Sequence, residues 1–231
     1  MTKAVIFDFS GTLFRCEDTA SWLRAALREA GIGGQEAEIA EAVPRLRAAG
    51  AQPGGESSYV PPAHEAQAWA MRDISARAHR SAYLARIDAA ALPWDGIADV
   101  LYARNASPEA WLPYSDTAAA LELLAGRGIP VVVLSNIGWD LRPVFRHHGL
   151  DPYVRDYVQS YEEGVVKPDP RIFRRACELL GHAPEAVLMV GDDPVDAGAT
   201  AIGCAFRAVP HLPREERPDA LLAAVNDVGR T

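Results

Sequence analysis

The chain has 231 residues, of which 49% are hydrophobic and 23% are charged, as in ordinary soluble globular proteins. Its 23 basic and 31 acidic residues give a formal net charge of −8, which argues against nucleic acid as a partner because phosphate binding needs a positive field. We expect no membrane span and no export signal, and three scattered cysteines without a CxxC pair favour a reducing, cytoplasmic location.

The first predicted element is a buried strand over residues 4–9, because its apolar, β-branched run stops at Gly11. The next ninety or so residues show helical periodicity. Helices are predicted there over residues 18–31, 36–49, 64–91 and 95–105. Pro44 is expected to kink or split the second helix, and residues 51–62, rich in proline, glycine and serine, are expected to form a loop. No strand is predicted between roughly residues 17 and 113.

From residue 114 onward, predicted strands alternate with predicted helices. The strands are expected over residues 130–135, 157–159, 187–190 and 205–209. The helices are expected over residues 116–125, 141–148, 170–180 and 195–202. Such alternation indicates a parallel sheet with helices on both faces. We therefore predict an α/β fold: a Rossmann-like parallel-sheet core, residues 1–16 and 114–231, with an inserted α-helical cap domain, residues 17–113.

Three of the predicted strands end in small or acidic polar residues. These endings are Asp8-Phe9-Ser10-Gly11-Thr12, Ser135-Asn136 and Gly191-Asp192-Asp193. Parallel strands bring their carboxyl ends to one edge of the sheet, where ligands of open α/β sheets bind. We therefore expect these side chains to converge on one functional site.

Four motifs follow one another in the chain. They are Asp8-Phe9-Ser10-Gly11-Thr12-Leu13, Ser135-Asn136, Val166-Lys167-Pro168-Asp169-Pro170 and Gly191-Asp192-Asp193-Pro194-Val195-Asp196. In type, order and position at strand ends they resemble the motifs of the haloacid dehalogenase superfamily. The placement of the helical insert resembles the branch of that superfamily with a cap after the first strand. The resemblance implies a hydrolase.

The resemblance implies that Asp8 is the catalytic nucleophile, since a carboxylate can form a covalent intermediate with a phosphoryl group or a carbon centre. Lys167, one of only two lysines in the chain, would neutralise the Asp8 carboxylate and phosphate oxygens together. Ser10 is the third residue of the predicted catalytic group. Substrate binding is assigned to Gly11, Thr12, Ser135 and Asn136.

The resemblance also implies a Mg²⁺ cofactor. Its expected ligands are the carboxylates of Asp8, Asp192 and Asp193 and the backbone carbonyl of Ser10, all of them hard oxygen donors. Asp196 has two open interpretations, as a support for the metal ligands or as a helix cap. Three acids within five residues repel one another, which favours a cation bound among them. A solvated acidic loop is the alternative interpretation.

Ser10 departs from the pattern, because most phosphatases of the superfamily carry a second aspartate at that position. A serine hydroxyl supplies no carboxylic acid, and general acid–base catalysis contributes roughly 10²–10⁴ in rate. We therefore expect slow turnover of alkyl phosphates unless the cap provides a substitute. Glu17 and His64 are candidate proton donors, and Tyr59 is a candidate to face the site.

These arguments predict a Mg²⁺-dependent hydrolase that acts on a small phosphorylated or otherwise activated substrate through an aspartyl-phosphate on Asp8. Two alternatives stay open. One is a 2-haloacid dehalogenase-like hydrolase, because carboxylate attack on carbon needs no proton for the leaving halide. The other is a catalytically weak binding or regulatory protein that keeps the fold and the metal site. No oligomeric state is predicted.

Overall fold

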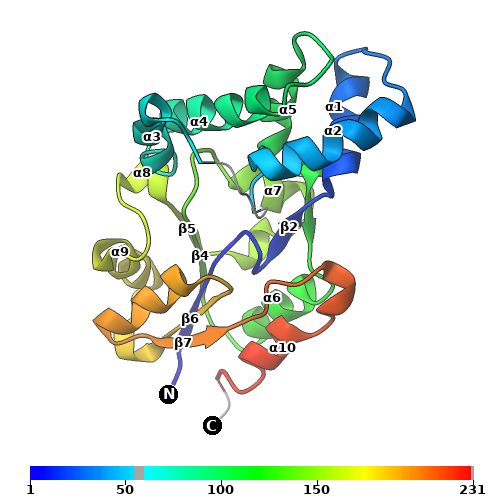
Figure 1. The fold of residues 1–231 in the computed structure, drawn as a ribbon. Helices are drawn as coiled ribbons and strands as arrows, with labels where there is room; N and C mark the ends of the chain where they lie inside the picture. Colours follow the sequence, from blue (N-terminus) through cyan, green and yellow to red (C-terminus); the bar gives the residue numbers. More distant parts are fainter. Residues whose placement is uncertain (55–59, 230–231) are drawn as a thin grey trace.

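The structure, a computed structural model, describes residues 1–54 and 60–229, and its centre is a parallel sheet (Figure 1). The strands of this sheet in the described residues are β1 (Ala4–Phe7), β4 (Val131–Ser135), β5 (Asp156–Gln159), β6 (Val187–Gly191) and β7 (Ala205–Ala208). Their spatial order is β5-β4-β1-β6-β7, and every neighbouring pair is parallel. The predicted α/β fold class is confirmed.

The strand order reverses direction at β1, which lies in the middle of the sheet. Val5 pairs with Val131 of β4 on one side and with Leu188 of β6 on the other. The chain adds β4 and β5 on the first side and then crosses over to add β6 and β7 on the second. Such a switch point leaves a crevice at the carboxyl ends of the strands. The fold therefore places its crevice beside the end of β1, directly before Asp8.

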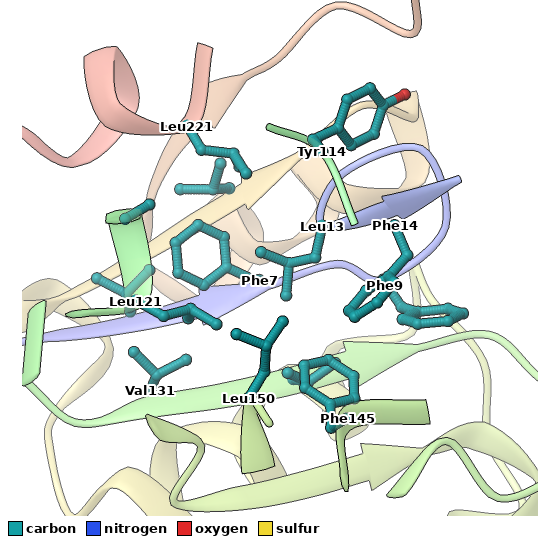
Figure 2. Close-up of a cluster of buried hydrophobic side chains, with 14 of the residues drawn as sticks. Phe7, Phe9, Leu13, Phe14, Tyr114, Leu121, Val131, Phe145, Leu150 and Leu221 are labelled. Carbon is teal, nitrogen blue, oxygen red and sulfur yellow. The ribbon is translucent and has the colours of Figure 1, made fainter. Parts of the chain in front are cut away.

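Helices bury both faces of the sheet. Val5 and Phe7 point into one hydrophobic cluster, and Ala4 and Ile6 point into another. The first face packs against α6 (Thr117–Gly126), α7 (Arg142–His147) and α10 (Ala220–Val225). The second packs against α9 (Pro170–Leu180) and the 3₁₀ helix Pro194–Ile202. Figure 2 shows the first face, where Phe7 lies among side chains from the helices; burying one such side chain contributes roughly 1.5–3 kcal/mol.

The predicted cap, residues 17–113, is largely helical in the residues that the structure describes. Its helices are α1 (Thr19–Glu29), α2 (Glu36–Ala49), α3 (Ala63–Ala70), α4 (Ala76–Ala89) and α5 (Ile97–Asn105). They form a hydrophobic cluster of their own, in which Trp22 and Leu101 are fully buried. Figure 1 shows these helices at the end of the sheet towards which β1 runs. The division into two domains stays a prediction.

Two predictions about the cap were wrong. Residues 64–91 form α3 and α4 rather than one helix, because the chain turns before Ser75, whose hydroxyl accepts a hydrogen bond from the Ala78 amide and caps α4. A strand is also present where none was expected: β3 (Trp111–Pro113) pairs with β2 (Phe14–Cys16) in an antiparallel ribbon. Three residues are too few to show a strand periodicity.

Three further features of the cap bear on the sequence analysis. Asp18 caps α1 at the predicted start of this helix, accepting hydrogen bonds from the Ala20 and Ser21 amides at 3.1 and 3.0 Å. Pro44 does not split α2. Part of the predicted loop over residues 51–62, with Tyr59, lies outside the described residues.

The remaining helices are short. They are α8 (Ser160–Glu163) and the 3₁₀ turns Pro108–Ala110, Asp151–Tyr153, Pro184–Ala186 and Arg214–Glu216. Across residues 1–54 and 60–229, no helix has both the length and the apolar character that crossing a membrane requires.

The cap contacts the core where α4 meets the loop after β4. His79 of α4 is buried, and a Cβ atom added to Gly138 of the loop would lie 2.4 Å from the His79 Cβ. The His79 Nδ1 also lies 3.0 Å from the Tyr102 hydroxyl. Gly138 therefore permits a close contact between α4 and the core.

Acidification is expected to destabilise the protein through His79. Burial lowers the pKa of His79 to about 4, whereas an unfolded histidine titrates near 6.5. Between these values the unfolded state binds more protons, so the free energy of unfolding falls as pH falls, by up to about 3 kcal/mol. Urea denaturation of the wild type and His79→Gln between pH 7.5 and pH 4.5 measures this effect. A pH dependence that is the same in both proteins would contradict it.

Candidate active site

A cavity of about 590 Å³ lies between the carboxyl ends of the strands and the cap. Its lining contains most of the predicted site residues, namely Asp8, Ser10, Ser135, Asn136, Lys167, Asp192 and Asp193. Gly11 lines an adjoining cavity of about 700 Å³, which shares Ser10 with the first. Thr12 is fully buried. The expected convergence of the strand ends is therefore present in the structure.

Lys167 joins two carboxylates at the centre of the site. Its Nζ donates to Asp8 Oδ1 and to Asp196 Oδ1, at 2.6 Å in each case, and all three residues are buried. Burial lowers the pKa of Lys167, but the two carboxylates outweigh it and raise the pKa above its ordinary value. Burial raises the pKa of Asp8 to about 7, against the opposing effect of the ammonium. The lysine is therefore a fixed positive charge beside Asp8.

Asp192 is held by residues from both ends of the chain. Thr12 Oγ1 donates to Asp192 Oδ1 at 2.8 Å, and His211 Nδ1 lies 2.6 Å from Asp192 Oδ2. Burial raises the pKa of Asp192, but hydrogen bonds with His211 and Thr12 outweigh it and leave the pKa below its ordinary value. Gly11 has a φ of 89°, and an added Cβ would lie 2.2 Å from Asp192 Oδ2. Only glycine permits this close approach.

Three carboxylates form a candidate cation site. One oxygen each from Asp8, Asp192 and Asp196 lies within 4.8 Å of the others. With the Lys167 ammonium the group has a formal charge of 1 − 3 = −2 when all three acids are ionised. Hard oxygen donors with excess negative charge suit Mg²⁺. The donor set therefore fits the predicted cofactor.

Asp193 and Asp196 have different surroundings in the structure. The Asp193 carboxylate accepts from the Val195 amide at 2.9 Å and caps the 3₁₀ helix Pro194–Ile202. The Asp196 carboxylate accepts from the Asp193 amide at 3.1 Å and from Lys167. Asp196 therefore both caps the helix and supports the site, and Asp193 as a metal ligand stays a prediction.

Asn136 holds the loop that carries the lysine. Its Nδ2 donates to the Lys167 carbonyl at 3.1 Å, and its Oδ1 accepts from the Lys167 amide at 2.7 Å. Both polar groups of this side chain are thus bonded to the lysine backbone. The side chain orients Lys167, and a contact of Asn136 with substrate stays a prediction.

Two residues of the site were missing from the sequence-based set. His211 follows β7 by three residues, so the argument from strand ends would have found it. Arg217 is buried and donates to the carbonyls of Gly11, at 2.6 Å, and Thr12. Its guanidinium stacks on the Tyr114 ring, 3.2 Å from the ring centre. Arg217 fixes the loop after β1, and no sequence pattern identifies it.

The cap contributes an aromatic and charged wall to the cavity. Arg72 and Arg86 stack on Trp69, at 4.1 and 3.3 Å from the ring centre. Other cap residues that line this cavity include Asp73, His79, Tyr83 and Trp111.

The two predicted proton donors lie elsewhere among the described residues. Glu17 lines the adjoining cavity and is paired with Arg104 at 2.6 Å, and the His64 side chain is 80% exposed. Neither residue lines the cavity that contains Asp8.

Comparison with known proteins adds to this geometry. A family model described as haloacid dehalogenase-like hydrolase matches residues 2–201. The chain is 36% identical over 110 residues to phosphoserine phosphatase from Thermus thermophilus, covering 46% of this chain and 44% of the relative. It is also 36% identical over 87 residues to (S)-2-haloacid dehalogenase 4A from Burkholderia cepacia, covering 37% of each protein. The chain thus spans less than half the length of these two curated relatives.

The fold is similar to that of a solved dehalogenase over the whole chain. The TM-score is 0.64 at 23% sequence identity, and the match covers 100% of this chain and 98% of the dehalogenase. At this identity the likeness establishes the fold and not the reaction. The sequence relatives include phosphatases and dehalogenases, two kinds of hydrolase.

Proposed function

This chain belongs to the haloacid dehalogenase-like hydrolase family, and from that premise we propose that it is a Mg²⁺-dependent phosphohydrolase. Its substrate would be a small phosphorylated metabolite, and the reaction would pass through an aspartyl-phosphate on Asp8. The observation that carries the proposal is the group of three carboxylates, Asp8, Asp192 and Asp196, around one lysine at the edge of the cavity.

The carboxylates of Asp8, Asp192 and Asp196 would hold the cation, with the Ser10 carbonyl and Asp193 as further predicted ligands. Bound Mg²⁺ would supply positive charge to the phosphoryl oxygens. This net negative group of acids favours a cation-dependent reaction, because without added positive charge the three carboxylates repel one another.

The chain's own residues have separate roles in the proposed reaction. Lys167 holds Asp8 Oδ1 and so fixes the direction in which the carboxylate attacks phosphorus. The Ser135 hydroxyl, at the end of β4, lines the cavity and would donate to a phosphoryl oxygen. Thr12 holds Asp192 by a hydrogen bond, and Gly11 leaves room for its carboxylate.

Dehalogenation of a 2-haloacid is the second candidate function. Two observations favour it: Ser10 has no acid for a leaving group, which a halide does not need, and Trp69, Trp111 and Trp139 line the cavity. Its mechanism would use the same nucleophile: Asp8 attacks the carbon that carries the halogen, the carbon–halogen bond breaks and halide leaves, and water then hydrolyses the resulting ester.

An activity panel with and without Mg²⁺ tests the proposal. We expect release of phosphate from aryl and acyl phosphates that stops with a chelator and returns with Mg²⁺, and no release of halide from 2-haloacids. Halide release that persists in the chelator, without phosphate release, would support the dehalogenase instead. Beryllofluoride binding without turnover of any substrate would indicate a regulatory protein.

A further inference from the structure

The proposed phosphohydrolase needs a general acid and base that Ser10 does not provide. Among the described cap residues, three with titratable side chains other than arginine line the cavity beside Asp8, namely Asp73, His79 and Tyr83. Each is a candidate for proton transfer. Their surroundings distinguish them.

His79 and Tyr83 do not suit the role at neutral pH. Burial lowers the pKa of His79 to about 4, so its ring is neutral and holds no acidic proton. Burial raises the pKa of Tyr83 to about 12, so the phenol keeps its proton. On the core side of the cavity, the His211 ring is bonded to Asp192, a proposed metal ligand.

Asp73 lies at the corner between α3 and α4, which is tied to the core near Ile137, another residue that lines the cavity. The buried Ser160 hydroxyl, at the start of α8, donates to the Asp73 carbonyl, and it accepts from the Ile137 amide at 2.8 Å. Figure 1 shows this corner of the cap next to α8. The Asp73 side chain is 18% exposed, and its carboxylate lies 3.1 Å from the Arg72 guanidinium. Its position in the cavity is therefore fixed from both sides.

The charged and titratable groups around Asp73 come from the cap and the core. Burial raises the pKa of Asp73, and the cations of Arg72 and Lys167 oppose this rise without cancelling it. Tyr83 lines the same cavity, and the Asp73 carboxylate adds to the burial that raises the pKa of its phenol. His79 lines the same cavity from α4. These surroundings favour a carboxyl group that exchanges its proton closer to neutral pH than an exposed aspartate does.

We propose that Asp73 is the general acid and base of the reaction, in place of the carboxyl group that Ser10 lacks; this inference rests on the proposed phosphohydrolase function. In the first step, Asp8 forms a bond to phosphorus, the bond from phosphorus to the leaving oxygen breaks, and Asp73 gives its proton to that oxygen. In the second step, Asp73 takes a proton from water while the water oxygen bonds to phosphorus. The bond from Asp8 to phosphorus breaks, releasing phosphate.

Asp73→Asn removes the exchangeable proton with little change in shape. We expect kcat/KM for phenyl phosphate, whose phenolate is a poor leaving group, to fall about 10²–10³-fold. With 4-nitrophenyl phosphate, whose leaving group needs no proton, the first step should continue and the aspartyl-phosphate should accumulate as a burst. The basic limb of the pH profile of kcat/KM for phenyl phosphate should disappear. Asp73→Glu should retain part of the activity, and Asp88→Asn, an exposed change on α4, should leave it unchanged.

A rescue experiment separates proton transfer from a structural role. Ser10→Asp added to Asp73→Asn should restore phenyl phosphate hydrolysis, because it returns a carboxyl group to the cavity. Wild-type rates and an unchanged pH profile in Asp73→Asn would overturn the inference. A loss that Ser10→Asp does not rescue, together with weaker inhibition by inorganic phosphate, would also overturn it. If the wild type hydrolyses no phosphate ester with Mg²⁺, the proposed function itself fails, and the inference falls with it.

Discussion

Replacing Asp8 with asparagine is expected to lower kcat for aryl phosphates by at least about 10⁴-fold. The carboxamide is a poor nucleophile and forms no stable bond to phosphorus. The loss should reside in chemistry rather than folding, because Lys167 keeps its 2.6 Å contact with Asp196. Steady-state kinetics and trapping of the phosphorylated protein measure this outcome.

The controls for this variant test folding and specificity. Thermal unfolding should show that Asp8→Asn is folded. Asp88→Asn, a change of the same kind at an exposed position, should keep wild-type activity and be phosphorylated as the wild type is. Turnover by Asp8→Asn within about tenfold of the wild type would contradict the role of Asp8 as nucleophile.

Ser10→Asp is expected to accelerate hydrolysis of phosphate esters with poor leaving groups. A carboxyl group two residues after Asp8, the proposed nucleophile, would provide acid–base catalysis, worth about 10²–10⁴ in rate where no other group supplies it. With Asp73 present the gain should be smaller, on the order of tenfold, and in Asp73→Asn it should exceed about 10²-fold. A Cβ added to Gly54 of the cap would lie 3.2 Å from the Ser10 hydroxyl, so glycine keeps the cap backbone close to this position.

Ser10→Asn is the matched control, since it has the size of aspartate without an acidic proton, and it should give no gain. Initial rates for phenyl phosphate at saturating Mg²⁺ provide the comparison. No gain from Ser10→Asp in either background, while Asp8→Asn is inactive, would show that position 10 does not limit proton transfer.

The residues that lie at strand ends were predictable from the sequence. Asp8, Ser135 and Asp192 each follow or end an apolar run, and a parallel sheet must bring such residues to one edge. The same rule applies to His211 after β7, which the motifs did not single out. Lys167 was identified by its motif and by the scarcity of lysine in the chain.

The cap was harder to predict in detail. Hydrophobic periodicity indicated helices but not the break between α3 and α4, because both segments continue an apolar pattern across the turn. That turn decides where Asp73 lies. Asp73 lines the cavity, and Ser160, 87 residues further along the chain, binds its backbone carbonyl.

The class of fold, the run of helices between the first strand and the rest of the sheet, and the position of Asp8 at the end of β1 were all predictable from the sequence alone. These features depend on local periodicity and on residue order, both of which can be read directly from the sequence. Three arrangements are visible only in the folded protein: Lys167 bonds Asp196 rather than Asp193 together with Asp8, Arg217 fixes the loop after β1, and Asp73 lines the cavity. Each of these contacts joins residues far apart in sequence, and their geometry follows from packing in three dimensions, which leaves no periodic pattern in the chain.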